Sequence, residues 1–381
     1  MNYPISRIKQ NKWSKYYHNI RQRHTMCNFV GNDLLKRIIE EGPQDLRKVA
    51  VQNLEVSNGL RNVRKTRAGM YAMFISSGSK KRREIYDMKH SFNTDDLAGY
   101  GPILTENDKT PLPNDEDANK ALDGSGYTFD FYKKIFHRTS IDNNGMILIS
   151  SVRFGENYGN AFWTNKYMVY GEGGDGFFKR GRMTDLSVCA HELTHGVTDY
   201  EANLNYSDEA GGLNEGMSDI FGCMCEQWVN KETVNDAHWL IGKDILENGA
   251  ALRSMKEPGK AHSFDNQIAH YDDFDSSQDP HISSGIANRA FYLTCMELGG
   301  HSWEKAGKIW YIALKDALSE NSTFQDASNA TFTIAGQFYG SESKEQKGVY
   351  KGWDGVGVSP QPVTLENVIK TSRRRELASK V

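Results

Sequence analysis

Two segments in the second half of the chain carry a narrow apolar stripe at helical spacing, with polar residues on the opposite side. The first, in residues 184–200, is formed by Leu186, Ala190, Leu193 and Val197. The second, in residues 211–228, is formed by Met217, Ile220, Phe221, Met224 and Trp228. Residues three or four apart lie on one face of a helix. The pattern therefore predicts two helices that each bury one face and leave the other for polar groups.

The rest of the chain divides by the same criteria. Residues 27–56 show helical periodicity broken by EEGPQD, which predicts two short helices, and the Gly, Ser, Lys and Arg-rich run 58–84 is typical of a protease-accessible linker. From about 84 to 183, runs such as MILISSVRF and AFWTNKYMVYG predict strands and turns. Helical patterns dominate residues 184–340, and the stretch that begins SPQP is predicted to be a tail.

Composition describes an ordinary globular protein of 381 residues, with 25% charged and 38% hydrophobic residues. No apolar run approaches the roughly 18 residues of a transmembrane helix. The start, MNYPISRIKQ, is basic but lacks the apolar region of a standard signal peptide. The five cysteines are odd in number and irregularly spaced, so we do not expect a disulfide scaffold.

Charge is unevenly distributed along the chain. Residues 1–70 hold fourteen Lys/Arg against five Asp/Glu, a net of +9, so the remainder of the chain, whose total is −3, carries −12. A basic head of this kind can bind nucleic acid, an anionic membrane or the acidic body of its own chain. It lacks the aromatic interleaving of nucleic-acid binders. We expect the head to dock on its own body, with neither nucleic acid nor membrane as a partner.

The stretch CAHELTHGVTDY at 189–200 carries the candidate chemistry. His191 and His195, four apart, project from one helical face and suit a single metal ion. Glu215 and Asp219 share the polar face of the second helix, which predicts Glu215 as third ligand and Asp219 as acceptor for a ligand histidine N–H. The ordinary alternative is a surface histidine pair and a solvated acidic face. The second helix, with two carboxylates opposite its apolar stripe, weighs against it.

HELTHGVTDY and GGLNEGMSDIFG closely resemble the two metal-bearing helices of the thermolysin-like zinc metallopeptidases, within them the protealysin-like branch. The resemblance continues in NAFWTNKYMVYG, ALRSM and DPHISSGIANRAFYL and covers roughly residues 84–358. It implies an α+β fold, in which a zinc cleft separates a β-rich N-terminal lobe from a mainly helical C-terminal lobe. The head, CNFVGNDLLKRIIEEG, is similar to the short propeptide of that branch, although Val30–Gly31 replaces its usual proline pair.

The resemblance implies a role for each matching residue. One Zn²⁺ per chain would be held by His191, His195 and Glu215, with Glu192 as the proton-transferring carboxylate. His281 and Tyr206 would stabilise the oxyanion, and Asp279 would orient His281. Substrate backbone and side chain would be held by Asn160, Ala161, Arg253, Val188 and Leu252, with cleavage before large apolar residues.

Calcium is where the sequence departs from the resemblance. Of the family's double calcium site only Glu226 is intact, because position 187 is Ser and position 243 is Lys. A lysine ammonium repels a dication, so the double site is predicted absent, which leaves room for a single weaker site elsewhere.

Cys27 raises a separate hypothesis, since its thiolate could block the zinc of a precursor. A small buried apolar residue is the favoured interpretation.

Together these features predict a zinc endopeptidase made as a zymogen and acting as a monomer on proteins or peptides. The expected parts are a propeptide and processing linker (1–75), the two lobes (76–200 and 201–358) and a tail (359–381). The resemblance implies secretion without a standard signal peptide, with a cytoplasmic precursor as the alternative. A non-hydrolytic zinc-binding protein acting through its basic head is the rival function, and the presence of Glu192 speaks against it.

Overall fold

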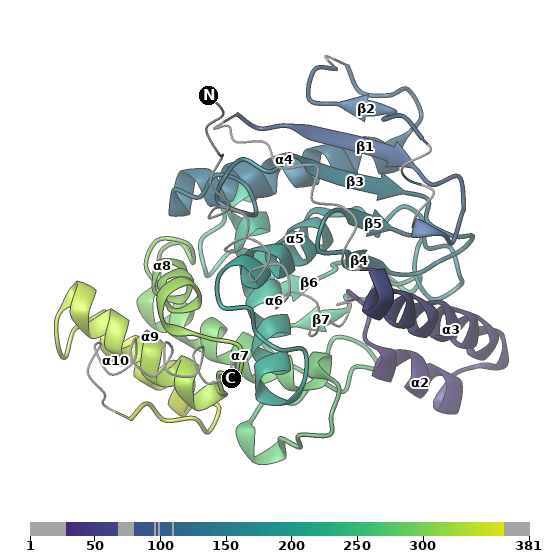
Figure 1. The fold of residues 1–381 in the computed structure, drawn as a ribbon. Coiled ribbons are helices and arrows are strands. Elements are labelled where there is room, and N and C mark those ends of the chain that lie inside the picture. The colour runs from purple at the N-terminus through teal and green to yellow at the C-terminus, as the bar shows by residue number, and fades with distance from the viewer. Residues whose placement is uncertain (1–27, 68–79, 95–96, 98–99, 109, 362–381) are drawn as a thin grey trace, which may run out of the picture.

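The computed structural model describes residues 28–67, 80–94, 97, 100–108 and 110–361. Cys27, residues 68–79 of the predicted linker and the tail from 362 lie outside these residues. The described part has a sheet with a long helix against it, a helical lobe below, and a two-helix head at one side (Figure 1). The α+β architecture with two lobes is as the sequence predicts.

The N-terminal lobe is built on a five-stranded mixed sheet with the strand order β2-β1-β3-β5-β4. The three inner strands are parallel and the two edge strands antiparallel: β1 (Arg83–Asp87), β2 (Leu104–Thr105), β3 (Leu148–Val152), β4 (Ala161–Trp163) and β5 (Met168–Tyr170). Both strand predictions are confirmed, since β3 lies in MILISSVRF and β4–β5 form a hairpin in AFWTNKYMVYG. Strand β4 ends the sheet, and the outer side of its backbone pairs with Asn28 through Phe162.

The helix α4 (Glu116–Phe136) interrupts the lobe that the sequence predicts as strands and turns. Its sequence is rich in glycine and aromatic residues and has a low intrinsic helix propensity, so the sequence analysis does not predict this helix. Tertiary packing overrides that propensity, because α4 lies against β1, β3 and the helix α5 (Leu186–Tyr200). Gly124 makes the close approach possible: a Cβ there would come within 2.7 Å of the Cys189 sulfur.

Three long helices form the centre of the molecule: α5, α6 (Asp208–Asn230) and α7 (Pro280–Leu298). Helix α6 packs against both of the others. The two predicted apolar stripes lie in the core, all their members fully buried except the partly buried Leu186 and Trp228. Gly222 lets α6 approach α5, since a Cβ on it would lie 3.0 Å from the Ser187 carbonyl oxygen and 3.1 Å from the His191 nitrogen.

Short elements complete the C-terminal lobe: β6 (Leu240–Ile241), β7 (Arg253–Ser254), the 3₁₀ turn Tyr271–Asp273, α8 (Ala306–Ile312), the π turn Ala313–Ala317, α9 (Phe324–Tyr339) and α10 (Lys344–Asp354). Residues 231–279 are mostly loop, where the sequence predicts helix, and α10 continues the helical region past residue 340. The lobe closes around a parallel stack of Trp310 and Trp353, with ring centroids 6.1 Å apart.

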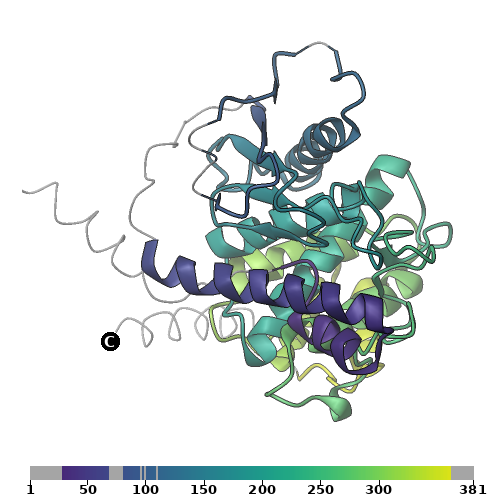
Figure 2. The ribbon, with the colours of Figure 1, turned by 90° about the vertical axis from the view of Figure 1, so that its right-hand side faces the viewer.

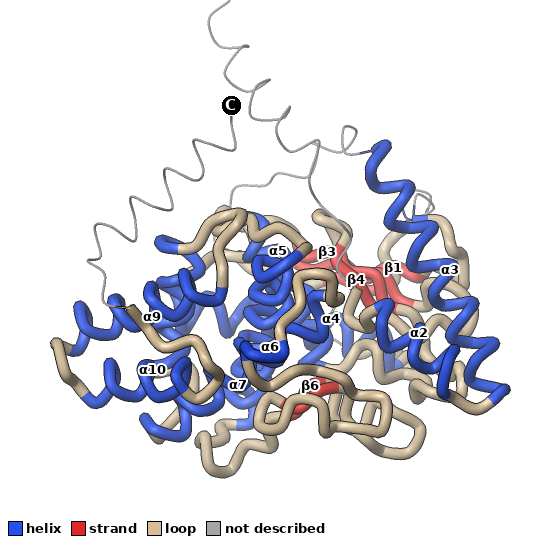
Figure 3. The backbone as a smooth tube through the Cα atoms, turned by 90° about the horizontal axis from the view of Figure 1, so that it is seen from below, coloured by secondary structure: helices blue, strands red, loops and turns tan. Residues whose placement is uncertain are grey.

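The head consists of α2 (Asn32–Glu41) and α3 (Gln44–Arg67), a helical hairpin beside the β4 edge of the sheet (Figures 1, 2). Seen from below, it lies at the opposite end of the molecule from α9 and α10 (Figure 3). The two-helix prediction is confirmed, but α3 runs ten residues into the predicted linker. No proline follows Pro43 in this stretch to end the helix.

Gly222→Ala tests the close packing of α5 and α6. A methyl group against backbone costs about 1–3 kcal/mol, more than the ~1 kcal/mol that alanine gains over glycine in a helix. We expect the free energy of unfolding in urea to fall by about 1–2 kcal/mol. Gly101→Ala is the control, because nothing lies within 4 Å of its Cβ position. Equal stability of the two variants would contradict this account.

Candidate metal centre

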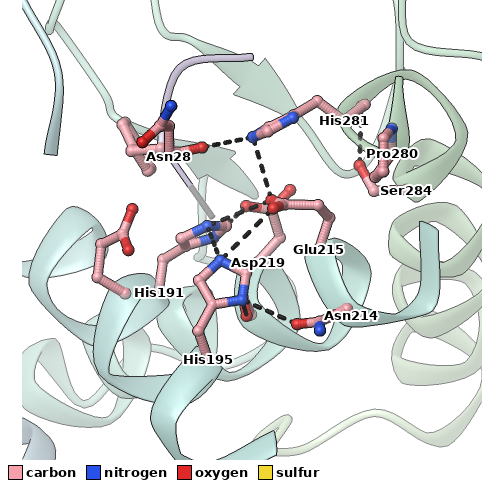
Figure 4. Close-up of polar contacts among 12 residues, drawn as sticks. Asn28, His191, His195, Asn214, Glu215, Asp219, Pro280, His281 and Ser284 are labelled. Carbon is pink, nitrogen blue, oxygen red and sulfur yellow. Dashed lines mark hydrogen bonds and ion pairs between the residues drawn. The ribbon is translucent and has the colours of Figure 1, made fainter. Parts of the chain in front are cut away.

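The two central helices bring three predicted ligands together in a buried triangle (Figure 4). His191 and His195 come from α5 and Glu215 from α6, and all three side chains are essentially inaccessible to solvent. The two histidine Nε2 atoms are 3.1 Å apart. Each lies near a Glu215 oxygen, at 3.4 Å for His191 and 3.5 Å for His195.

These three donors fit a zinc ion. Ligands about 2.0–2.1 Å from a tetrahedral ion lie about 3.3–3.4 Å from one another, close to the observed separations. The Nδ1 atoms of both histidines face oxygen acceptors, Asp219 Oδ1 and Asn214 Oδ1, each at 2.8 Å. The Nδ1–H tautomer leaves both Nε2 lone pairs pointing into the triangle. Glu215 Oε2 is buried there without a hydrogen-bond partner, as a metal ligand would be.

Burial and neighbouring charges set the pKa values, and therefore the protonation states, of the three candidate ligands. Burial lowers the pKa of His195 to about 4, so this imidazole is neutral at pH 7. Burial alone would also lower the pKa of His191, but the Asp219 and Glu215 carboxylates raise it. Burial opposes ionisation of Glu215, yet the surrounding histidines hold its pKa well below its usual range. A dication in the triangle would displace the His191 proton, so metal binding and proton release are coupled.

Asp219 connects the ligands to the rest of the site. Besides His191 Nδ1, its carboxylate accepts Arg253 Nε–H at 2.9 Å, a second Arg253 nitrogen at 2.7 Å, and the Asn288 amide at 2.8 Å. Burial would raise the pKa of Asp219, but Arg253 and His191 lower it strongly. The fixed anion favours the Nδ1–H form of His191.

Glu192 lies beside the ligands without being one of the triangle. Its Oε2 accepts the Trp163 backbone N–H at 2.8 Å, while Oε1 is buried and has no hydrogen-bond partner. Burial and the nearby Glu215 charge raise the pKa of Glu192 well above its ordinary value. A carboxyl group with one oxygen anchored, one free and a raised pKa suits the transfer of a proton near neutral pH.

His281 and Tyr206 face the triangle from the helical lobe. Asp279, the N-cap of α7, accepts the His281 backbone N–H at 3.1 Å and its Nδ1–H at 2.7 Å. This leaves His281 Nε2 directed at the site, 3.4 Å from Glu215 Oε2. The Tyr206 hydroxyl donates to Glu215 Oε1 and lies 3.4 Å from His281 Nδ1. Both residues therefore reach the metal triangle, and Asp279 contacts His281 as expected.

Comparison with known proteins gives the family. The model of the thermolysin metallopeptidase catalytic domain matches residues 53–199, and that of the alpha-helical domain of the same family matches residues 202–358. An extracellular metalloprotease of Pectobacterium carotovorum is 36% identical over 346 residues, 87% of this chain and 96% of that protein. The chain belongs to the thermolysin family of metallopeptidases.

Two further matches define the place of this metallopeptidase in the family. The thermolysin of Alicyclobacillus acidocaldarius is 38% identical over 244 residues, which is 61% of this chain and 44% of that protein. The solved precursor of protealysin, a metalloproteinase from Serratia proteamaculans, is 35% identical with a TM-score of 0.75, covering 87% of this chain and 100% of that one. This structural match supports the placement of the chain in the protealysin-like branch, which its sequence also resembles. Zinc is the ion that this family implies.

Four of the five predicted peptide-binding residues lie against an extended segment of the head, Phe29 and Val30. Asn160 exchanges two hydrogen bonds with Val30, Ala161 accepts the Phe29 N–H, and Arg253 donates to the Phe29 carbonyl at 2.8 Å. Leu252 lies beside Phe29, because its Cβ and the tip of the Phe29 ring come within 3.3 and 3.4 Å of the Cβ position of Gly242. Val188 is fully buried in the core. Asn160, Ala161, Arg253 and Leu252 thus contact or adjoin this segment of the head, which supports their assignment to peptide binding.

Sequence reasoning missed several groups of this site. Asn214 and Ser218 both approach His195 Nδ1, at 2.8 and 3.0 Å, and their position on the polar face of α6 was a usable signal. No local pattern marks Asn28, Phe29 and Val30 as residues that lie at the site. Their contacts join residues 130 or more positions apart in the sequence.

Asp219→Asn tests the connection between the buried carboxylate and the metal ligands. Loss of the anion that holds His191 should weaken zinc binding about 10–100-fold. Competition with a chelator of known affinity measures the change. Asp316→Asn, at a half-exposed residue of the π turn, is the matched control. Unchanged zinc affinity in Asp219→Asn would show that the negative charge of Asp219 does not tune the site.

Proposed function

We propose that this metallopeptidase is the zymogen of a zinc endopeptidase that cleaves before large hydrophobic residues. The observation that carries the proposal is the buried triangle of His191, His195 and Glu215, with Glu192 beside it and an apolar side chain, Phe29, seated in the adjoining pocket. The Phe29 ring meets the edge of the His191 ring at 5.2 Å and lies under the Arg253 guanidinium at 4.8 Å. A pocket filled by phenylalanine accounts for the proposed preference.

Peptide binding would proceed by strand addition to the edge strand β4. Asn160 offers both an acceptor and a donor to one residue of a bound chain, at 2.9 and 3.2 Å to Val30. Ala161 offers its carbonyl, and Arg253 grips the next carbonyl. Main-chain hydrogen bonds of this kind supply affinity for any sequence, while pockets for side chains supply the selectivity.

The chemistry would be shared between the ion and the side chains around it. Zinc, when bound, polarises the peptide carbonyl and lowers the pKa of water from about 16 toward 7. Glu192 takes the proton from water with its free oxygen and passes it to the leaving amine. His281 Nε2–H and the Tyr206 hydroxyl donate hydrogen bonds to the carbonyl oxygen as it gains negative charge. Asp279 keeps the His281 proton donor in place.

We propose that the head keeps the enzyme latent. We assign the head and linker to residues 1–75, the two lobes to 76–200 and 201–358, and the tail to 359–381. The contacts of the head differ from those that the charge pattern suggests. Among residues 28–57, the part of the head whose side chains the structure describes, no ion pair to the described body is found. Hydrogen bonds with at least one neutral partner and apolar contacts hold the head instead. Asn53 donates to Asp175 at 2.9 Å, Ser57 meets the Tyr158 hydroxyl at 3.0 Å, and three apolar side chains of α2 are buried: Leu34, Leu35 and Ile38.

The location outside the cell is proposed from relatives, since the Pectobacterium protein is named an extracellular metalloprotease. In the part of the chain that the structure describes, no helix is long and apolar enough to cross a membrane. We propose an exported monomer that acts on proteins or peptides, with a cytoplasmic precursor as the alternative. The non-hydrolytic alternative is not favoured, because Glu192 is present beside the metal triangle with one oxygen free of hydrogen bonds.

The double calcium site is proposed to be absent. The Ser187 hydroxyl accepts the Gly242 N–H at 3.2 Å in place of a metal-binding carboxylate. Glu226 remains, but burial raises its pKa to about 7. Among the described residues, only the His191, His195 and Glu215 group gathers three metal-binding side chains closely enough for an ion.

Glu192→Gln tests the proposed proton transfer. Glutamine keeps an oxygen that can accept the Trp163 N–H but cannot take a proton from water, so kcat should fall about 10²–10⁴-fold. A quenched peptide with phenylalanine after the scissile bond measures it, using the enzyme freed of its head by a second protease. Zinc content should remain one per chain, and Glu297→Gln, on the surface of α7, should match the wild type. Full activity in Glu192→Gln would remove the mechanism.

Calcium addition tests the loss of the double site. An ion at 100 times its Kd stabilises a protein by about 2.7 kcal/mol, whereas no site gives no shift. We expect Tm in scanning calorimetry to change by less than about 1 °C between millimolar calcium and a calcium-selective chelator. A rise of several degrees would mean that a calcium site exists in the chain.

A further inference from the structure

The head crosses the metal cleft as an extended strand with a defined polarity and register. Asn28 pairs with Phe162 of β4 in the antiparallel sense, and the Phe29 N–H donates to the Ala161 carbonyl at 2.9 Å. The next residue, Val30, exchanges both of its backbone hydrogen bonds with the Asn160 side chain. Every backbone group from the Phe29 nitrogen to the Val30 carbonyl is therefore paired with the body.

The Asn28 carbonyl is the head carbonyl that lies over the metal triangle. Its oxygen accepts a hydrogen bond from His281 Nε2 at 2.6 Å, and that same nitrogen is 3.4 Å from Glu215 Oε2 (Figure 4). The next two carbonyls point elsewhere: Phe29 to Arg253 and Val30 to Asn160. The group that His281 would polarise in a substrate is thus, in this chain, the Asn28 carbonyl.

The residue on the other side of this peptide bond fills the apolar pocket. Phe29 is fully buried, and the tip of its ring comes within 3.4 Å of the Cβ position of Gly242, next to Leu252. The Asn28 side chain, in contrast, has no hydrogen-bond partner. The register therefore depends on the backbone contacts and on the Phe29 ring.

We propose that the Asn28–Phe29 bond is a substrate of this chain's own active site and is hydrolysed within one molecule. The proposal rests on the proposed endopeptidase function and adds to it the bond that is cut. The oxygen of water adds to the Asn28 carbonyl carbon, the C–N bond breaks, Asn28 leaves as a carboxylate and Phe29 becomes the new amino terminus. Glu192 accepts the proton of water and gives it to the departing Phe29 nitrogen.

This cut alone does not free the cleft. Residues 29–67 remain joined to the body through the chain, and side-chain hydrogen bonds still hold them: Asn53 to Asp175, Ser57 to Tyr158 and Asn266 to Asp33. Phe29 stays in its pocket as a bound product. Maturation then has two steps, a cut at residue 28 followed by a cut between α3 and β1 that lets the head leave.

The experiment uses the full-length protein, prepared without metal by chelation and started by adding zinc. Intact mass and amino-terminal sequencing should show a chain that begins at Phe29. Its first-order rate should stay constant over about a hundredfold range of protein concentration, because the reaction is intramolecular. A rate that rises with protein concentration, or no chain beginning at Phe29, would overturn the proposal.

Two variants of the pocket residue sharpen the test. Phe29→Leu keeps an apolar side chain and should cut within about tenfold of the wild-type rate. Phe29→Asp would place a carboxylate in the apolar pocket and should slow the cut at least about a hundredfold. Equal rates in the two variants would contradict the register. Hydrogen exchange gives a second reading: in Glu192→Gln, which stays intact, the Phe29 amide should be protected, and the added Phe29→Asp change should remove that protection.

A separate assay distinguishes the failure of this proposal from the failure of the proposed function. The enzyme is freed of its head by a second protease and supplied with the quenched peptide. Peptide hydrolysis with an uncut Asn28–Phe29 bond in the precursor overturns only the self-cleavage. Absence of both activities in zinc-loaded protein overturns both.

Discussion

One buried carboxylate, that of Asp219, organises both halves of the active site. It accepts hydrogen bonds from His191 of the metal triangle, from Arg253, which in turn holds the Phe29 carbonyl of the head, and from Asn288 of α7. A buried anion is tolerated only when it is fully paired. The metal triangle, Arg253 and the α6–α7 contact are therefore coupled, because loss of any charged or hydrogen-bonded partner leaves a buried charge less compensated.

The same arrangement accounts for both proposals about the head: that it inhibits the enzyme and that the active site cuts its Asn28–Phe29 bond. Strand addition to β4 fixes the direction of any bound peptide, and the apolar pocket fixes its register. The head makes the same kinds of contact that are proposed for a substrate: backbone hydrogen bonds to β4 and Arg253 and an apolar side chain in the pocket. The proposed latency then depends on the second set of contacts, those of Asn53 and Ser57 in α3, which hold the head on the body.

Sequence patterns reveal the parts of this architecture that are local. The apolar stripes of α5 and α6 and the His191, His195 and Glu215 spacing follow from helix periodicity, so the helices and the ligand triangle are predictable. Helix α4 is not, because its glycines and aromatic residues are poor helix formers that only packing against α5 and the sheet stabilises. The loops of residues 231–279 and the path of Phe29 depend on contacts distant in sequence, which no periodicity encodes.

The small size of the two-helix head has a consequence for the direction of maturation. Its helices, of 10 and 24 residues, bury Leu34, Leu35, Ile38 and Ala50 in the core that they share with the enzyme body. A fragment of about forty residues without this support cannot bury enough apolar surface to keep its shape, and short helices melt when isolated. If the head is removed as proposed, it is expected to unfold and lose the surface that would let it rebind. Activation thereby becomes a one-way event.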